Sequence, residues 1–167
     1  GRHRYSRLAS AAVARMVEGL MQAAAELAPP RRRIATGPRD QALRTARTCY
    51  DHIAGRLGVA LADALVAGGH AELAPDGGLV TERGFAFLSG LGIDLQDPDR
   101  PSSRRVLCRP CLDWSERRPH IGGRLGAELC SKSLASGWVR RGEMARVLTI
   151  TPKGYRAFRE IFGARLD

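Results

Sequence analysis

The sequence predicts a mainly α-helical protein with short β-hairpins, an α+β fold in which two winged-helix-like helix–hairpin–helix repeats follow a long N-terminal helix. The first observation is an internal repeat: HIAGRLG at 52–58 returns as HIGGRLG at 120–126. The second is TERG at 81–84, which is answered by TPKG at 151–154. The third is a series of apolar residues at helical spacing, separated by turns that contain glycine and proline. Such self-similarity indicates two copies of one small unit.

Residues 1–28 predict a strand followed by a helix. Basic and bulky residues alternate over 1–8, which is typical of one strand of a hairpin. Ser10 is suited to cap a helix, and apolar residues then recur every three or four positions as far as Ala28. Residues 29–39 contain three prolines and three consecutive arginines, so we expect a linker there.

The first repeat is expected to span residues 40–95. An apolar stripe from Leu43 to Ala64 predicts a helical segment that starts at Asp40 and ends at Gly68-Gly69. The stripe passes through Gly55 and Gly58, so the helix is either continuous or bent there. A short hairpin with its turn at 75–78 follows, and Thr81 can cap a last helix.

The second repeat is expected over residues 111–167, after a polar, basic connection at 96–110. It predicts a helix over 121–136, strands at 138–141 and 147–150, and a helix from Thr151. Proline at the first position of that helix is favourable because its missing N–H has no partner to lose.

The formal net charge of +10 suggests a polyanionic partner such as nucleic acid. The arginines are spread along the chain, so a solvated basic surface remains an alternative. No apolar run reaches the length of a bilayer and no signal peptide is evident, so we expect a cytoplasmic protein without a membrane partner. Because the first residue is Gly1 and not Met, we expect the chain to be a fragment.

Four cysteines in a cytosolic protein favour metal, redox or packing roles over structural disulfides. Cys108 and Cys111 have the CxxC spacing of two zinc ligands, and Cys49 and His52 supply a second pair three residues apart. We therefore predict a zinc site made of Cys49, His52, Cys108 and Cys111, with His120 and Asp113 as spare candidates. A reversible Cys108–Cys111 disulfide and simple packing are the alternatives. Cys130 is expected in the core.

The segment DWSERR at 113–118 has two structural interpretations. Asp113 followed by Glu116 is the pattern of a helix capping box. The acid beside Arg117 and Arg118 also suggests a buried ion-pair network that fixes one repeat against the other, with Trp114 as its apolar anchor. His52 and His120 occupy the same repeat position, so we expect them to hydrogen-bond across the interface between repeats.

The octapeptide GRHRYSRL at 1–8 and the alanine-rich helix after it resemble the wing and following helix of ArsR-type bacterial repressors. The rest of the chain resembles the C-terminal extension of a longer subgroup of that family, through ARTCYDH at 46–52 and CRPCLDWSERRPH at 108–120. The resemblance implies an intact protein that binds double-stranded operator DNA as a homodimer. Its wing would contact DNA through Arg2, His3 and Arg4. These residues would position the protein on DNA and would not specify the sequence. The helix over 10–28 would then contribute to the dimer interface.

The chain would accordingly be the dimerisation and sensing part of a transcriptional regulator that responds to metal or thiol oxidation. The family's recognition helix precedes the wing, so this chain would lack it. No nucleophile–base pair, phosphate loop or HExxH motif is present, so we do not expect an enzyme. The alternative is a scaffold domain in which zinc, if bound, only stabilises the fold.

Overall fold

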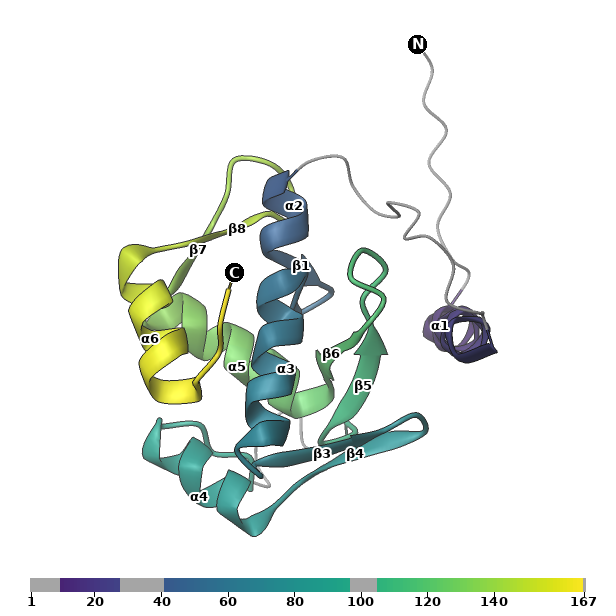
Figure 1. Ribbon diagram of the computed structural model, residues 1–167, viewed down its shortest axis with the longest axis horizontal. Helices are drawn as coiled ribbons and strands as arrows, with labels where there is room; N and C mark the ends of the chain where they lie inside the picture. Colours follow the sequence, from purple (N-terminus) through teal and green to yellow (C-terminus); the bar gives the residue numbers. More distant parts are fainter. Residues whose placement is uncertain (1–9, 28–40, 97–104, 167) are drawn as a thin grey trace. The chain divides into compact units, whose positions relative to one another are not determined.

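A computed structural model describes residues 10–27, 41–96 and 105–166 of the chain (Figure 1). The chain divides into two compact units, Gly1–Ile34 and Ala35–Asp167. The first unit contains α1 (Ala11–Leu27), and Ser10 caps it as expected, its Oγ accepting a hydrogen bond of 3.2 Å from the Val13 N–H. The predicted strand at 1–8, its candidate DNA contacts Arg2, His3 and Arg4, and the linker at 29–39 lie outside the described residues.

The second unit is built from two repeats of hairpin, helix, hairpin and helix. A short helix, α2 (Gln41–Thr45), comes before the first repeat. The elements of the first repeat are β1 (Arg47–Cys49), β2 (His52–Ala54), α3 (Arg56–Ala67), β3 (Ala71–Ala74), β4 (Gly77–Val80) and α4 (Glu82–Gly90). The elements of the second are β5 (Arg109–Leu112), β6 (Pro119–Gly122), α5 (Gly123–Ala135), β7 (Val139–Arg141), β8 (Leu148–Ile150) and α6 (Pro152–Phe162).

The α+β class with its short antiparallel hairpins is confirmed, but the helix predicted from Asp40 to Gly68 is wrong. The chain leaves α2 after Thr45, forms the hairpin β1–β2, and enters α3 at Arg56. Gly55 explains the break: its φ is 79°, and a Cβ there would lie 2.7 Å from the Arg44 carbonyl oxygen. The apolar spacing misled because buried positions in a tight hairpin and in the following helix fall at similar intervals.

The second repeat also begins with a hairpin and not with a helix. Its strand β5 starts at Arg109, inside the stretch that was predicted to be a connection. Its helix starts at Gly123, since residues 119–122 form β6. Gly123 has a φ of 78° and corresponds to Gly55, so both repeats turn from hairpin to helix through a glycine in the left-handed region.

The later half of each repeat agrees with the sequence prediction. The Thr81 hydroxyl accepts a hydrogen bond of 2.9 Å from the Gly84 N–H, and the Thr151 hydroxyl accepts one of 3.0 Å from the Gly154 N–H. These threonines cap α4 and α6 directly after the hairpins β3–β4 and β7–β8.

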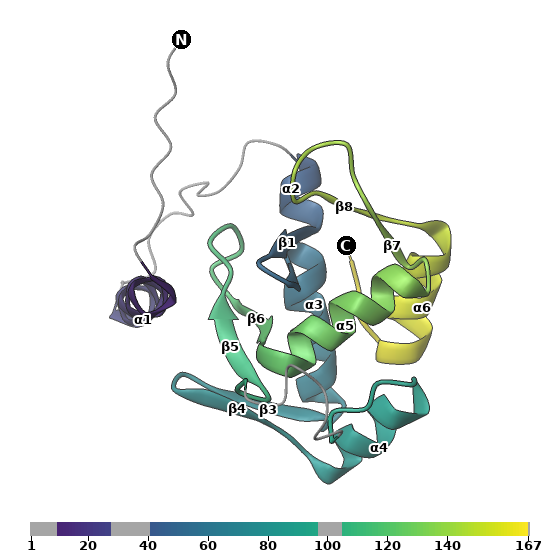
Figure 2. The ribbon, with the colours of Figure 1, turned by 180° about the vertical axis from the view of Figure 1, so that it is seen from behind.

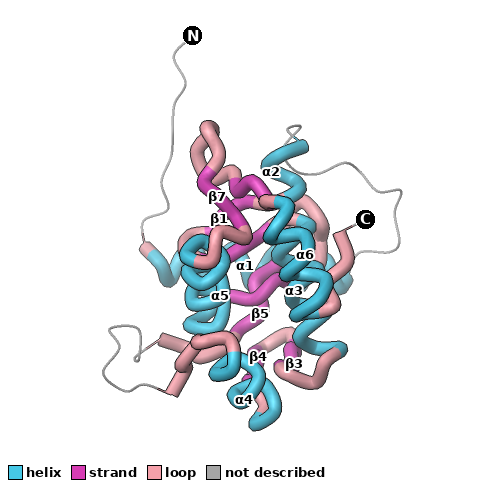
Figure 3. The backbone as a smooth tube through the Cα atoms, turned by 90° about the vertical axis from the view of Figure 1, so that its left-hand side faces the viewer, coloured by secondary structure: helices cyan, strands magenta, loops and turns pink. Residues whose placement is uncertain are grey.

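Each repeat packs one of its helices against a strand of the other repeat. Helix α3 lies against β6 of the other repeat, and α5 lies against β2 (Figures 1 and 2). The contacts are close because they occur at glycines: a Cβ on Gly58 would lie 3.3 Å from the His120 Cβ, and one on Gly126 would lie 2.9 Å from the His52 Cβ. In Figure 3 strand β5 runs between α5 on one side and α3 on the other.

The later hairpin of each repeat also contacts the first hairpin of the other repeat. Gly78 of β4 forms a β-bridge with Cys108, next to β5, and Arg47 of β1 forms one with Val147, next to β8. Buried residues of both repeats, such as Leu57, Leu65, Leu125 and Phe158, belong to one hydrophobic core. The repeats therefore interlock around a shared core, which places their first hairpins face to face.

Candidate metal centre

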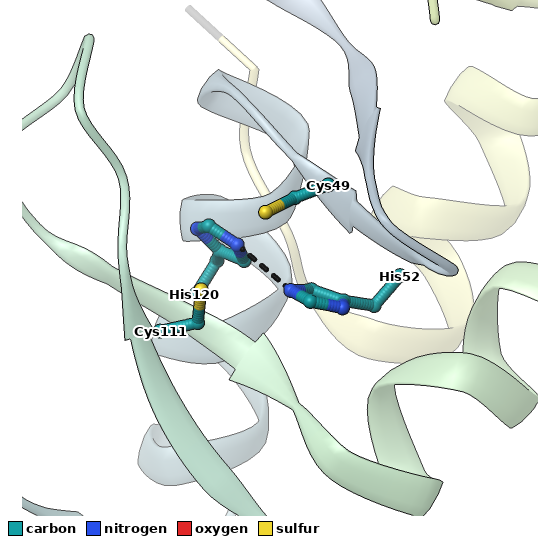
Figure 4. Close-up of side chains that lie close together, drawn as sticks. All are labelled: Cys49, His52, Cys111 and His120. Carbon is teal, nitrogen blue, oxygen red and sulfur yellow. Dashed lines mark hydrogen bonds between the residues drawn. The ribbon is translucent and has the colours of Figure 1, made fainter. Parts of the chain in front are cut away.

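Four metal-ligating side chains meet where the two first hairpins face each other. They are Cys49 of β1, His52 of β2, Cys111 of β5 and His120 of β6 (Figure 4). One ligand atom from each lies within 4.8 Å of the others. Cys49 is partly exposed and the other three residues are buried.

The strand register explains why these four residues meet. Cys49 is the cross-strand partner of His52, and Cys111 is the cross-strand partner of His120. The two pairs occupy the same position in their hairpins, so each repeat supplies one thiol and one imidazole. The centre is therefore built on the approximate twofold relation between the repeats.

The distances suit a tetrahedral ion with nitrogen and sulfur ligands. The Nε2 atoms of His52 and His120 are 3.2 Å apart, the contact drawn as a dashed line in Figure 4. Zinc–nitrogen bonds of about 2.0–2.1 Å at tetrahedral angles place two nitrogens about 3.3 Å apart. The hydrogen bond expected between these histidines is thus present, and its geometry is also that of two ligands on one ion.

Each histidine turns its other ring nitrogen toward a carboxylate. The Nδ1 of His52 lies 3.4 Å from an oxygen of Asp51, and the Nδ1 of His120 lies 3.4 Å from an oxygen of Asp113. Carboxylates in this position fix the tautomer and orientation of metal-bound histidines and make them better ligands. The donor set and its outer partners both fit a metal.

Asp113 connects the centre to the first repeat. It is fully buried, and its carboxylate accepts hydrogen bonds of 2.8 and 2.9 Å from Nη2 of Arg47 and one of 2.7 Å from the Gly55 N–H. The backbone N–H groups of Ser115 and Glu116 donate two more, of 2.9 and 3.0 Å. Burial opposes ionisation, but His120, the Gly55 N–H, Ser115 and the Glu116 N–H lower the pKa of Asp113 far below its ordinary value.

The ion-pair network predicted at 113–118 is confirmed, with a different cation. Asp113 pairs with Arg47, whose guanidinium lies 4.9 Å from the centroid of the Trp114 ring. Arg118 lies at the surface and pairs with Asp63. The capping-box interpretation is wrong, because no helix follows Asp113: residues 114–116 form a turn and residues 117–118 a bend.

The pKa of Cys49 is shifted in the opposite direction to the pKa values of Cys108 and Cys130. The Cys111 thiol, together with His120 and His52, lowers the pKa of Cys49 despite partial burial, which favours the thiolate that metals bind. Burial raises the pKa of Cys108 to about 11 and also raises the pKa of Cys130. Cys130 lies in the core, as expected.

Three of the four predicted ligands come together, and Cys108 does not join them. Its sulfur lies against Gly78, where an added Cβ would be 3.0 Å from it, and its β-bridge to Gly78 keeps it in the packing between β4 and β5. His120 takes the fourth position. The CxxC spacing misled, because residues 109–112 are extended and the chain points alternate side chains to opposite faces. The repeat itself held the better signal, since His120 is the counterpart of His52.

The chain is 37% identical over 166 residues to the "Uncharacterized HTH-type transcriptional regulator YdfF" of Bacillus subtilis (strain 168), a match that covers 99% of this chain and 72% of that protein. The chain belongs to this family of HTH-type transcriptional regulators.

No family model matches the chain, and no solved structure matches it. Among the described residues, none of the helices has the length and apolar character needed to span a membrane.

Proposed function

We propose that this transcriptional regulator binds double-stranded DNA as a homodimer and carries one zinc ion on Cys49, His52, Cys111 and His120. The observation that carries the proposal is the convergence of these four ligand atoms within 4.8 Å from equivalent positions of two repeats. Within the regulator family we assign the chain to the longer ArsR-type subgroup and to the cytoplasm. In that assignment Arg2, His3 and Arg4 contact DNA, and α1 contributes to the dimer interface; its Met16, Leu20 and Leu27 are exposed.

Zinc is the metal that this donor set favours. Two thiolates and two imidazoles balance the charge of a divalent ion, and this combination is common in structural zinc sites. Magnesium and calcium prefer oxygen ligands, which the centre offers only in its outer layer. Four protein ligands fill a tetrahedral coordination sphere and leave no position for a reacting water, which supports a structural or regulatory role over catalysis.

The centre is connected to the rest of the fold through β1. The Thr48 N–H donates a hydrogen bond of 2.8 Å to the Arg146 carbonyl, and Nε of Arg146 donates one of 3.1 Å to the Thr48 carbonyl. Thr48 is next to Cys49 in β1. Zinc binding would therefore fix the β1–β2 hairpin, to which Arg146 is hydrogen-bonded. Zinc binding would in this way shift the population toward the conformation that binds DNA.

The proposal is tested on the purified full chain by fluorescence anisotropy with a pool of random-sequence duplexes. Measurements are made with zinc, after chelation, and after mild oxidation with hydrogen peroxide, with light scattering to follow the dimer. We expect DNA affinity to fall at least tenfold when zinc is removed and to recover when zinc is returned.

Cys130→Ala is the matched control, because it removes a thiol outside the centre and should leave the zinc response unchanged. DNA affinity that is the same with and without bound zinc would overturn the regulatory role of the metal. Unfolding on chelation with no DNA binding in any state would favour a scaffold domain instead.

A further inference from the structure

The two later hairpins of the repeats differ in charge although they share one fold. We call residues 71–90, which comprise β3, β4 and α4, the first wing, and residues 139–162, which comprise β7, β8 and α6, the second wing. The first wing has three acids and a single cation, Arg83. The second wing has six cations and two acids, its cations being Arg140, Arg141, Arg146, Lys153, Arg156 and Arg159. Duplicated elements that keep their fold and differ in charge have acquired different surfaces.

The cations of the second wing lie on its surface, where all six side chains are exposed. Arg140 pairs across the hairpin with Thr149, which is also exposed, whereas the neighbouring pair Val139 and Ile150 is buried. Because side chains alternate along a strand, Arg140 and Thr149 point away from the core.

Helix α6 continues this surface directly after β8. Its core-facing side chains are Ala157, Phe158 and Phe162, which are buried. Lys153 and Arg156 are three residues apart, so they lie next to each other on the exposed side of the helix. Arg159 is on the same helix and is partly neutralised by Glu160, at 3.6 Å.

We propose that the second wing is a contact surface for the phosphate backbone of double-stranded DNA, additional to the DNA contacts of the proposed function on which this inference rests. Exposed arginine and lysine side chains on a short hairpin and its adjoining helix bind phosphates and position a protein on the duplex. The first wing, with acids at Glu72, Asp76 and Glu82, would repel the same backbone. Only one of the two repeats can therefore approach DNA.

The second wing touches the β1–β2 metal hairpin through Arg146 and Thr48, and the first wing touches the other metal hairpin, β5–β6, through the bridge of Gly78 to Cys108. Occupancy of the centre would thus act on the surface that contacts DNA. The second wing would therefore be the element through which zinc occupancy regulates DNA binding.

The experiment measures binding of the zinc-loaded full chain to a 30-bp duplex of random sequence at several salt concentrations. The test variant is R140A/K153A/R156A. The matched control is R83A/R117A/R118A, which removes the same charge from exposed arginines elsewhere, including Arg83 at the position equivalent to Lys153. Zinc content and circular dichroism establish that both variants are folded.

We expect the test variant to bind at least tenfold more weakly and the slope of log affinity against log salt to fall by about 2–3, since each lost phosphate contact removes about 0.9. The control should stay within about twofold of the parent chain. Equal losses in both variants would overturn the inference, because net charge alone would then explain binding.

Unchanged affinity in the test variant would overturn the assignment of the second wing and leave the proposed DNA-binding function intact. A parent chain that binds no duplex even at low salt would overturn the second wing together with the DNA contact of the proposed function. Competition by polyglutamate as effective as that by DNA would also contradict the inference, because it would indicate an acidic protein partner.

Discussion

The two metal hairpins hold the same ligands in the same register but differ in how they are closed. The β1–β2 hairpin closes through Tyr50 and Asp51, and Asp51 is 44% exposed and paired with Arg105. The β5–β6 hairpin closes through a longer stretch in which Asp113 is 0% exposed and bound to Arg47. The repeats have thus remained alike at the four ligands and differ in the carboxylates behind them.

Removing the thiol from either hairpin should have the largest effect. Cys49→Ser and Cys111→Ser should each abolish tight zinc binding, because both repeats supply half of the donor set. Structural zinc is worth on the order of 10 kcal/mol in small zinc domains, so we expect cooperative unfolding to be lost or Tm to fall by more than about 10 °C. Calorimetry with and without chelator measures the effect, and Cys130→Ala, which should keep its zinc, is the control.

The two carboxylates behind the histidines, Asp113 and Asp51, should differ in how much they contribute to the free energy of unfolding. Asp113→Asn should lower the free energy of unfolding by about 3–5 kcal/mol, because it leaves the Arg47 guanidinium buried without its ion pair. Asp51→Asn should cost less than about 1 kcal/mol, because the Asp51–Arg105 pair is solvent-exposed. Urea denaturation at saturating zinc measures both; equal losses would show that burial does not distinguish the two hairpins.

Zinc affinity sharpens the same pair of variants. Loss of a carboxylate behind a metal-bound histidine typically weakens metal binding by about 10–100-fold. We expect that loss for Asp113→Asn, read by competition with a chromophoric chelator. Retention of full affinity in both variants would show that neither carboxylate supports its histidine.

The smallest effect tests whether the repeats must approach as closely as they do. Gly58→Ala and Gly126→Ala should each cost about 1–3 kcal/mol, because the new Cβ would lie 3.3 and 2.9 Å from the Cβ atoms of His120 and His52 in the other repeat. Each Cβ would also meet a carbonyl oxygen of its own repeat, that of Ile53 at 2.4 Å and that of Ile121 at 2.2 Å. Gly90→Ala is the control, since its Cβ would have open space and the change should be neutral or slightly stabilising. Thermal denaturation distinguishes them, and similar Tm values for all three would contradict the tight interface.

Much of the fold could be predicted because it depends on local signals. Thr81 and Thr151 mark helix starts by their capping chemistry, and the turn before Gly77 marks a hairpin. The break at Gly55 could not be read, because a glycine in an apolar stripe is compatible with a closely packed helix as well as with a turn. The need for φ of 79° there is set by the return of the chain toward Arg44.

Three of the four ligands of the candidate centre could be predicted, again from local signals. Cys49 and His52 are close in sequence and remain close across a hairpin. The choice between Cys108 and His120 depends on which of the two faces the β1–β2 hairpin, and that is a tertiary contact. Likewise, Arg47 gives no sign in the sequence that it would be the buried partner of Asp113, 66 residues away.

X-ray absorption at the zinc edge of the purified chain distinguishes the proposed ligand set from one that contains Cys108, because it counts sulfur and nitrogen ligands separately. We expect one zinc per chain with two sulfurs at about 2.3 Å and two nitrogens at about 2.0–2.1 Å, and an unchanged spectrum in Cys108→Ala. Three sulfur ligands, with one lost in Cys108→Ala, or a chain that retains no zinc, would contradict this expectation.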